Sequence, residues 1–357
     1  MRGRVAILPG YGEPVEIREY DVPSPEPGGL IVKIEQATVC GSDLHVWRAE
    51  TAAQSSDPAR LGFGHEGFGR IVALGPGTTV DDAGQAISVG DRVVHGVTLT
   101  LPGRGPRPEA DRTYGAFPYF FTTFADYYYV SANRPVYRVP DALSDDVLPA
   151  VNCAMGAAVS GLLRGGAGFG SHVVIFGAGG LGLTATAAAR YAGASSVTIL
   201  DRLADRLELA KAFGADHTIN VDDVPTVEER IALVQASTGG GADVVLELVG
   251  RAALFPEGVA MLAPAGTFVN VGLWYRGTTV AFDPSEVFRG QRRIIGSSGY
   301  PHTLLPKILD FLVRTKDDVP WERMVSHRFP LTEINEALAQ ADWAGKGGAV
   351  TRAALVP

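Results

Sequence analysis

The fold of this chain is decided by the segment Val173-Val174-Ile175-Phe176-Gly177-Ala178-Gly179-Gly180-Leu181-Gly182. Its apolar first part is typical of a buried strand, and the alanine-rich stretch that follows predicts a helix from about Gly180 to Tyr191. In that context the spaced glycines permit a tight turn, a close approach of a pyrophosphate and close helix–strand packing, with the helix N-terminus facing the phosphates. We therefore predict a dinucleotide site formed by Gly177, Gly179, Gly180, Leu181 and Gly182.

The pattern of alternating strands and helices continues after this segment. Arg202–Phe213 has the spacing of a helix. Apolar stretches typical of buried strands precede it at Val197–Leu200 and follow it at Asp243–Val249 and Thr267–Gly272. Strands that alternate with helices predict a doubly wound parallel sheet, the Rossmann arrangement.

The residues that follow the second predicted strand bear on the choice of cofactor. Asp201 stands where a carboxylate accepts hydrogen bonds from the ribose hydroxyls, and it would repel a 2′-phosphate. Arg202, beside it, could instead pair with that phosphate. The sequence therefore favours NAD over NADP, although Arg202 would favour NADP.

The first part of the chain has a different pattern, with short strands at Ile31–Gln36, Gly69–Leu74 and Arg92–Val94 separated by turns. This pattern predicts a β-rich, barrel-like domain. Helical stretches at Ile308–Val313 and Ile334–Ala341 precede a last strand. We expect a β-rich catalytic domain over 1–158, a dinucleotide-binding domain over 159–303, and a tail, 304–357, that returns to the first domain.

Charge and hydropathy narrow the range of partners and compartments. A chain of 357 residues is long enough for about two domains. Its formal net charge of −8 argues against nucleic-acid and anionic-membrane binding. The N-terminal apolar run is too short for a signal peptide, and no apolar stretch is long enough to span a bilayer. We expect a cytoplasmic protein, in which thiols stay reduced.

The two cysteines of the chain have a context that suits metal binding. Cys40 opens Cys40-Gly41-Ser42-Asp43-Leu44-His45, and His65 lies within Gly64-His65-Glu66-Gly67-Phe68-Gly69. Two thiolates and one imidazole would give zinc three protein ligands and leave one position open, as in catalytic sites. Cys153 has no local signature, so a packing role for it, with Glu66 completing the site, stays open.

These motifs, together with Gly90-Asp91-Arg92-Val93 and the glycine fingerprint, resemble the zinc-dependent alcohol and polyol dehydrogenases of the medium-chain dehydrogenase/reductase superfamily. The resemblance implies a GroES-like catalytic domain beside a Rossmann domain. It also implies that Cys40, His65 and Cys153 bind one catalytic zinc, with Glu66 as a nearby carboxylate or temporary ligand. Asp43 would then orient the His65 ring.

The same resemblance implies roles for further residues. Ser42 would accept the alcohol proton and His45 would pass it toward solvent, although a surface histidine is the alternative for His45. Arg352 would contact the cofactor pyrophosphate, or else be a solvated arginine. A homodimer or homotetramer is expected.

Many relatives hold a second zinc with four clustered cysteines, which this chain lacks. An arginine-rich loop, 102–112, replaces them, and substrate recognition and simple solvation are the alternatives for it.

The expected function is hydride transfer between an alcohol, such as a secondary alcohol, a polyol or an amino- or hydroxyalkyl alcohol, and NAD, or the reverse carbonyl reduction. One alternative is a zinc-free reductase of activated double bonds that uses NAD(P)H. Another, from a different class, is a nucleotide-binding regulatory or structural protein without activity. Neither the natural substrate nor the preferred direction follows from these motifs.

Overall fold

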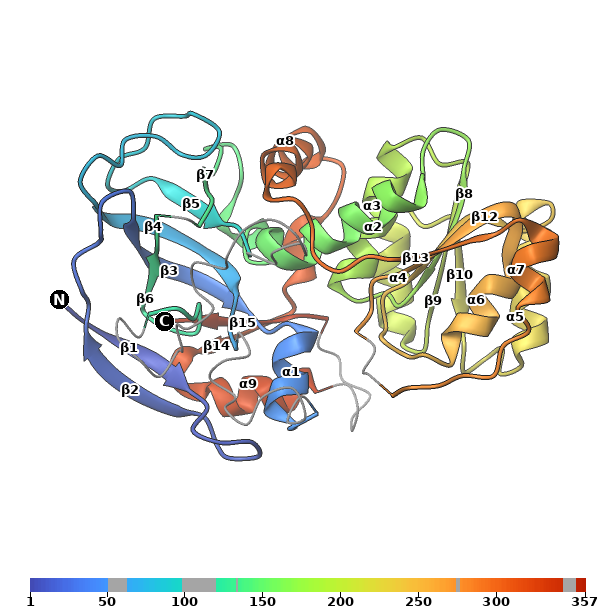
Figure 1. Ribbon diagram of the computed structural model, residues 1–357, viewed down its shortest axis with the longest axis horizontal. Helices are drawn as coiled ribbons and strands as arrows, with labels where there is room; N and C mark the ends of the chain where they lie inside the picture. The colour runs from blue at the N-terminus through green and yellow to red at the C-terminus, as the bar shows by residue number, and fades with distance from the viewer. Residues whose placement is uncertain (51–62, 98–119, 133, 274–276, 343–350) are drawn as a thin grey trace. The chain divides into compact units, whose positions relative to one another are not determined.

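The structure is a computed structural model, and it describes residues 1–50, 63–97, 120–132, 134–273, 277–342 and 351–357 (Figure 1). The arginine-rich loop 102–112 lies outside the described residues. The chain forms two compact units. The first comprises Met1–Cys153, Pro301–Asp317 and Trp321–Pro357, and the second comprises Ala154–Tyr300 and Asp318–Pro320.

The second unit contains a six-stranded sheet whose strand order is β10-β9-β8-β11-β12-β13. All neighbouring strands in it are parallel. The chain runs outward from β8 through β9 to β10 and then returns to β11 on the other side of β8, so the switch point lies between β8 and β11. The strands are β8 (His172–Phe176), β9 (Ser196–Asp201), β10 (His217–Asn220), β11 (Ala242–Glu247), β12 (Leu262–Asn270) and β13 (Arg293–Gly296).

Helices connect these strands and explain the sequence pattern. Strands β8 and β9 are almost continuously buried, as expected for a parallel sheet covered by helices on both faces. The predicted doubly wound Rossmann fold is therefore confirmed. The helices of this unit are α2 (Gly156–Gly165), α3 (Gly180–Tyr191), α4 (Ala204–Ala212), α5 (Val227–Thr238), α6 (Leu254–Ala260) and α7 (Ser285–Gly290).

The first unit contains a seven-stranded, mostly antiparallel sheet and a separate antiparallel pair, β1 and β2. In the larger sheet β14, β15, β3, β4, β5 and β7 lie in that order, and β6 also pairs with β3. The strands are β1 (Arg2–Ile7), β2 (Glu16–Asp21), β3 (Leu30–Thr38), β4 (Glu66–Leu74), β5 (Arg92–His95), β6 (Tyr127–Val130), β7 (Val136–Arg138), β14 (His327–Pro330) and β15 (Ala353–Val356).

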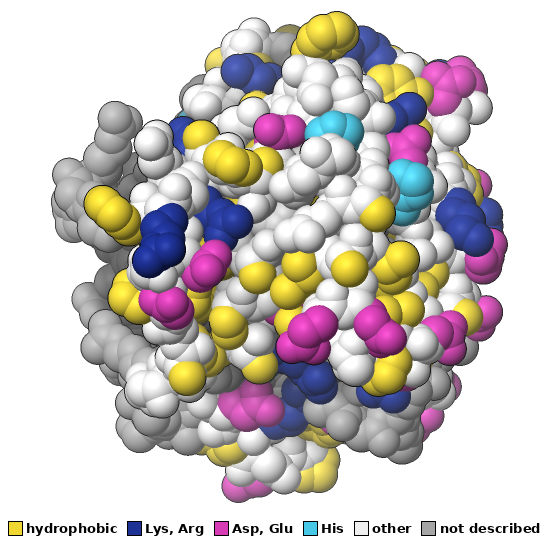
Figure 2. All heavy atoms as spheres, turned by 90° about the vertical axis from the view of Figure 1, so that its right-hand side faces the viewer, with side chains coloured by type: hydrophobic (Ala, Val, Ile, Leu, Met, Phe, Trp, Pro, Cys, Tyr) yellow, Lys and Arg dark blue, Asp and Glu magenta, His cyan; other side chains and the backbone are white. Residues whose placement is uncertain are grey.

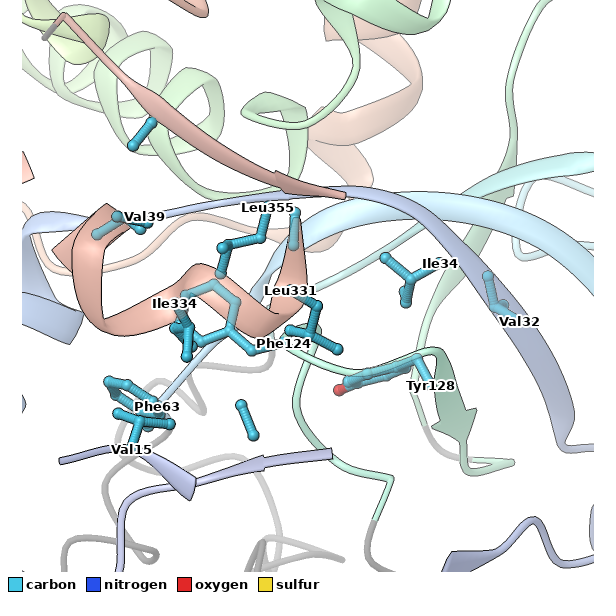
Figure 3. Packing of buried hydrophobic residues seen from close by; sticks show 14 of the residues in the cluster. Val15, Val32, Ile34, Val39, Phe63, Phe124, Tyr128, Leu331, Ile334 and Leu355 are labelled. Carbon is cyan, nitrogen blue, oxygen red and sulfur yellow. The ribbon is translucent and has the colours of Figure 1, made fainter. Parts of the chain in front are cut away.

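The core of the first unit joins residues from both ends of the chain. Val32 and Ile34 of β3 belong to the same buried cluster as Phe124, Ile334 and Leu355 (Figure 3). The helices of this unit include α1 (Gly41–Trp47), α8 (Leu305–Thr315) and α9 (Ile334–Ala341). The C-terminal tail thus supplies a helix and a strand to the unit that the N-terminal residues begin.

The surface carries charges of both signs. On the face shown in Figure 2, Lys and Arg side chains lie among Asp, Glu and apolar side chains. Among the described residues, no helix has the length and apolar character needed to cross a bilayer.

Candidate metal centre

Strand register brings the two predicted metal motifs together. Strand β3 ends at Thr38 and β4 begins at Glu66, and these two residues are paired across the antiparallel ladder. Because antiparallel partners lie side by side, Cys40, just after β3, and His65, just before β4, meet at one end of the sheet. Ligand atoms of Cys40, His65, Glu66 and Cys153 all lie within 4.8 Å of one another.

Asp43 fixes the relation between Cys40 and His65. Cys40 precedes α1, and its backbone N–H donates to Asp43 Oδ2 at 2.8 Å. The other oxygen, Oδ1, accepts from the Gly64 N–H at 2.8 Å and lies 3.4 Å from His65 Nδ1. A Cβ at Gly64 would lie 2.3 Å from Thr122 Oγ1, and its φ of +72° also favours glycine. The buried Asp43 therefore joins both motifs and lies where it can orient the imidazole, the role that the family resemblance implies.

The surroundings of the two thiols shift their pKa values in opposite directions. The Sγ atoms of Cys40 and Cys153 are 4.0 Å apart. The hydrogen bond with Cys153, together with His65, lowers the pKa of Cys40 well below its usual value. The same hydrogen bond, together with burial, raises the pKa of Cys153. Burial opposes protonation of His65, but the Asp43 carboxylate raises the pKa of that imidazole well above its usual value. A bound cation would displace the remaining protons.

Glu66 supplies a buried carboxylate beside the sulfur atoms. Its Oε2 accepts from Thr38 Oγ1 at 2.6 Å and forms an ion pair with Arg352. Its Oε1 is buried and has no hydrogen-bond partner among the residues that the structure describes. A buried oxygen left unpaired is costly unless a cation or water reaches it. Two sulfurs, an imidazole and this carboxylate form a donor set that fits zinc.

Arg352 is buried, which contradicts the alternative of a solvated arginine. Its guanidinium donates to Thr38 Oγ1 at 3.0 Å as well as pairing with Glu66. The sequence did not indicate this Thr38–Glu66–Arg352 network, because its members lie on β3, on β4 and just before β15. A pyrophosphate contact of Arg352 stays a prediction.

The glycine fingerprint lies in the second unit, where it forms the turn after β8 and the first residues of α3. Gly177 has a φ of +98°, and a Cβ at Gly182 would lie only 1.8 Å from the Gly177 carbonyl oxygen. Asp201, at the end of β9, accepts from the Ala178 N–H at 2.7 Å and from the Leu203 N–H at 3.0 Å. The bond to the Leu203 N–H holds the backbone before α4 in a turn, so this helix begins at Ala204 and not at Arg202 as predicted. Arg202 is exposed.

Comparison with known proteins identifies the family. The Alcohol dehydrogenase GroES-like domain matches residues 26–141, and the Zinc-binding dehydrogenase domain matches residues 180–314. A 5-exo-hydroxycamphor dehydrogenase from Pseudomonas putida is 32% identical over 334 residues, which cover 91% of each chain. The chain therefore belongs to the zinc-type alcohol dehydrogenases. This confirms the medium-chain dehydrogenase/reductase superfamily and its GroES-like domain.

Other members of the zinc-type alcohol dehydrogenases are similar over most of their length. L-threonine 3-dehydrogenase from Pyrococcus horikoshii is 32% identical over 288 residues, or 80% of each chain. The crystal structure of an alcohol dehydrogenase from Thermotoga maritima has a TM-score of 0.88 at 26% identity and covers 100% of both chains. A putative zinc-binding dehydrogenase from Sinorhizobium meliloti bound to NADP has a TM-score of 0.79 at 25% identity.

Helix α1 of this member of the family carries both predicted relay residues. Ser42 and His45 are three positions apart, so both lie on one side of the helix. His45 Nδ1 forms a hydrogen bond with Glu50 Oε2, a contact that the sequence did not indicate. The Ala49 N–H donates to Val46 O and the Glu50 N–H donates to His45 O, both at 3.0 Å, and Ala49 has a φ of 62°. This Schellman motif folds Glu50 back onto His45.

Cys153 lies in a π-helical turn, Val151–Met155, that precedes α2. Such turns are rare, and they are found often at functional sites. The neighbouring Asn152, also missed from the sequence, hydrogen-bonds the backbone around Glu66. The structure thus brings the predicted ligands together, although a packing role for Cys153 and ligation by Glu66 both stay open.

Proposed function

We propose that this chain is a zinc-dependent dehydrogenase that transfers hydride between a small-molecule alcohol and NAD, or catalyses the reverse carbonyl reduction. The observation that carries the proposal is the cluster of Cys40, His65 and Cys153 beside Glu66, within 4.8 Å of one another. Three such ligands leave one tetrahedral position for substrate. A purely structural zinc site would have a closed set of four ligands.

The residues of the cluster would hold zinc in different ways. Cys40 and Cys153 would bind it as thiolates and His65 through its ring, with Asp43 on the other ring nitrogen. When bound, zinc supplies Lewis-acid polarisation, which lowers the pKa of a hydroxyl group. Glu66 would remain beside the ligands, held by Thr38 and Arg352, and would be able to approach the cation during ligand exchange.

The proton of the alcohol would leave along helix α1. Ser42 Oγ would accept it, and His45 would pass it toward solvent. Glu50 holds the His45 ring through Nδ1, and a ring that donates from Nδ1 accepts protons at Nε2. Glu50 would therefore keep His45 in the tautomer that the relay needs.

The cofactor proposed is NAD. Asp201 touches the glycine loop, and its negative charge would disfavour a 2′-phosphate. The Sinorhizobium meliloti relative was solved with NADP, and Arg202 is exposed next to Asp201. Rates with both cofactors must therefore be compared directly, with NAD expected to be preferred.

The substrate proposed is a secondary alcohol. In 5-exo-hydroxycamphor, and at carbon 3 of L-threonine, the hydroxyl group is on a carbon that bears two other carbons. The two relatives named for these substrates are each 32% identical to this chain. Polyols and amino alcohols contain the same group, so they belong to the same test.

We also propose that the protein is cytoplasmic and assembles as a homodimer or homotetramer. Reduced thiols are needed for both proposed sulfur ligands, and a reducing compartment preserves them. Strand β13 lies at an edge of the sheet in the second unit, and Ile294 on it is 45% exposed. An exposed apolar edge strand is a ready site for pairing with a second copy.

A screen of alcohols that follows NADH or NADPH absorbance tests this function. Secondary alcohols should reduce NAD, a chelator should remove the activity, and added zinc should restore it. Activity with activated double bonds that survives chelation would instead indicate a zinc-free reductase. Nucleotide binding without turnover of any substrate in either direction would favour the regulatory or structural alternative.

Replacing Ser42 by alanine tests the proton relay. We expect kcat to fall by roughly 10²–10⁴-fold, the range that general acid–base groups contribute, because the alcohol proton loses its first acceptor. Zinc content should not change, since Ser42 is outside the cluster of ligand atoms. Steady-state kinetics and metal analysis on the same preparation check both points, and near-normal turnover would remove Ser42 from the mechanism.

A further inference from the structure

Asn152 is completely buried and directly precedes Cys153 in the π-helical turn. Its Oδ1 accepts from the Gly67 N–H at 3.2 Å, and its Nδ2 donates to the His65 carbonyl oxygen at 3.0 Å. The backbone groups determine the orientation of the amide, because an N–H can only donate and a carbonyl can only accept. One side chain therefore holds the backbone on both sides of Glu66.

The second Nδ2 proton faces another buried group. His95 Nε2 lies 3.4 Å from Asn152 Nδ2, and the His95 ring stacks on Tyr128 with 4.2 Å between ring centroids. Burial lowers the pKa of His95 to about 3, so its ring is neutral and can accept from the amide. Rotating the Asn152 amide would break its bonds to His65, Gly67 and His95 together.

The metal centre thus has two separate polar clamps. Asp43 joins the start of helix α1, next to Cys40, to Gly64 and His65. Asn152 joins the turn that carries Cys153 to the His65–Gly67 backbone. An apolar side chain of similar size would fill the space that Asn152 occupies, but it would leave these buried N–H and C=O groups without their partner.

We propose that Asn152 is a positioning residue of the metal centre, which sets the distance between the His65 imidazole and the Cys153 thiolate by clamping the backbone of His65 and Gly67. The inference rests on the proposed zinc site. Loss of a partner that orients metal ligands typically weakens metal affinity by about 10–100-fold. The same loosening should alter the ligand field, which depends on where the two sulfurs and the imidazole are held.

The test compares three variants of the full-length protein. Asn152→Ala removes the clamp, and Asn152→Leu keeps the size of the side chain but can neither donate to the His65 carbonyl nor accept from the Gly67 N–H. Asn335→Ala is the matched control, because the Asn335 amide accepts from the Val15 N–H at 2.8 Å and donates to the Val15 carbonyl at 2.9 Å in the same unit. Zinc affinity is measured by chelator competition, the ligand field by the absorption spectrum after cobalt(II) replaces zinc, and stability by urea unfolding.

We expect both Asn152 variants to bind zinc about 10–100-fold more weakly and to shift the cobalt(II)–thiolate bands. Asn335→Ala should lower the free energy of unfolding but keep the wild-type zinc affinity and cobalt(II) spectrum. Wild-type affinity and spectrum in both Asn152 variants would overturn this inference alone. An equal loss of zinc in Asn335→Ala would also overturn it, because the effect would then follow stability. Wild-type protein that binds no zinc would overturn the proposed function together with this inference.

Discussion

Replacing Cys40 by alanine is expected to weaken zinc binding by more than about 100-fold, which exceeds the usual effect of losing a partner that only orients a ligand. Of the two thiols in the cluster, Cys40 is the one whose pKa is lowered. The variant therefore loses the thiolate that a cation can bind without first displacing a proton. Dehydrogenase activity should fall to background, because Lewis-acid polarisation of the alcohol is lost. Metal analysis after dialysis and NADH formation measure the two effects.

Matched substitutions at the neighbouring groups decide which residue completes the site. Cys153→Ala should resemble Cys40→Ala if Cys153 is the third ligand, and Glu66→Gln should then retain most of the zinc. Loss of zinc in Glu66→Gln, with zinc retained in Cys153→Ala, would make Glu66 the third ligand and Cys153 a packing residue. Zinc at wild-type affinity in Cys40→Ala would contradict the assignment of the cluster as the zinc site.

Replacing Glu257 by alanine is expected to destabilise the protein by about 3–5 kcal/mol, the usual cost of removing one partner of a buried ion pair. Glu257 of α6 accepts from Arg230 Nε at 2.7 Å and from Arg230 Nη2 at 2.8 Å. The side chains are 4% and 10% exposed, so the guanidinium left behind would not be fully hydrated. Urea unfolding, followed by fluorescence and circular dichroism, measures the loss.

An exposed pair in the same protein provides the control. Asp310 and Arg314 of α8 lie 3.2 Å apart with side chains 69% and 65% exposed. Asp310→Ala should therefore cost less than about 0.5 kcal/mol. The double replacement of Arg230 by methionine and Glu257 by leucine should recover most of the loss, because no buried charge then lacks a partner. A loss below about 1 kcal/mol in Glu257→Ala would show that the pair is hydrated in solution.

The sequence predicted the Rossmann sheet well because its signals are local. The apolar run before Gly177 and the alanine-rich stretch after it define β8 and α3, and Tyr191 ends the helix as predicted. Helix α1 was not predicted, since its seven residues give too short a pattern to show helical periodicity. The antiparallel pair β1 and β2 was missed as well, and β2 has no fully buried residue to mark it.

The candidate site could be predicted where its residues have a local motif. Asp43 stands three positions after Cys40, so its link to the first motif is visible in the sequence. Asn152, Thr38 and Glu50 carry no such motif, because their roles depend on register, on a π-helical turn and on a helix C-terminus. The burial of Arg352 against Glu66 depends on β15 pairing with β3, which joins positions far apart in the chain.

The most direct test of the account is the zinc content of the purified wild-type protein. Both cysteines of the chain belong to one cluster, so no thiol remains for a second, four-thiolate site. We expect about one zinc per chain, held by a three-ligand catalytic site. A value near zero after zinc-replete expression, or a value near two, would contradict a single catalytic zinc at Cys40, His65 and Cys153.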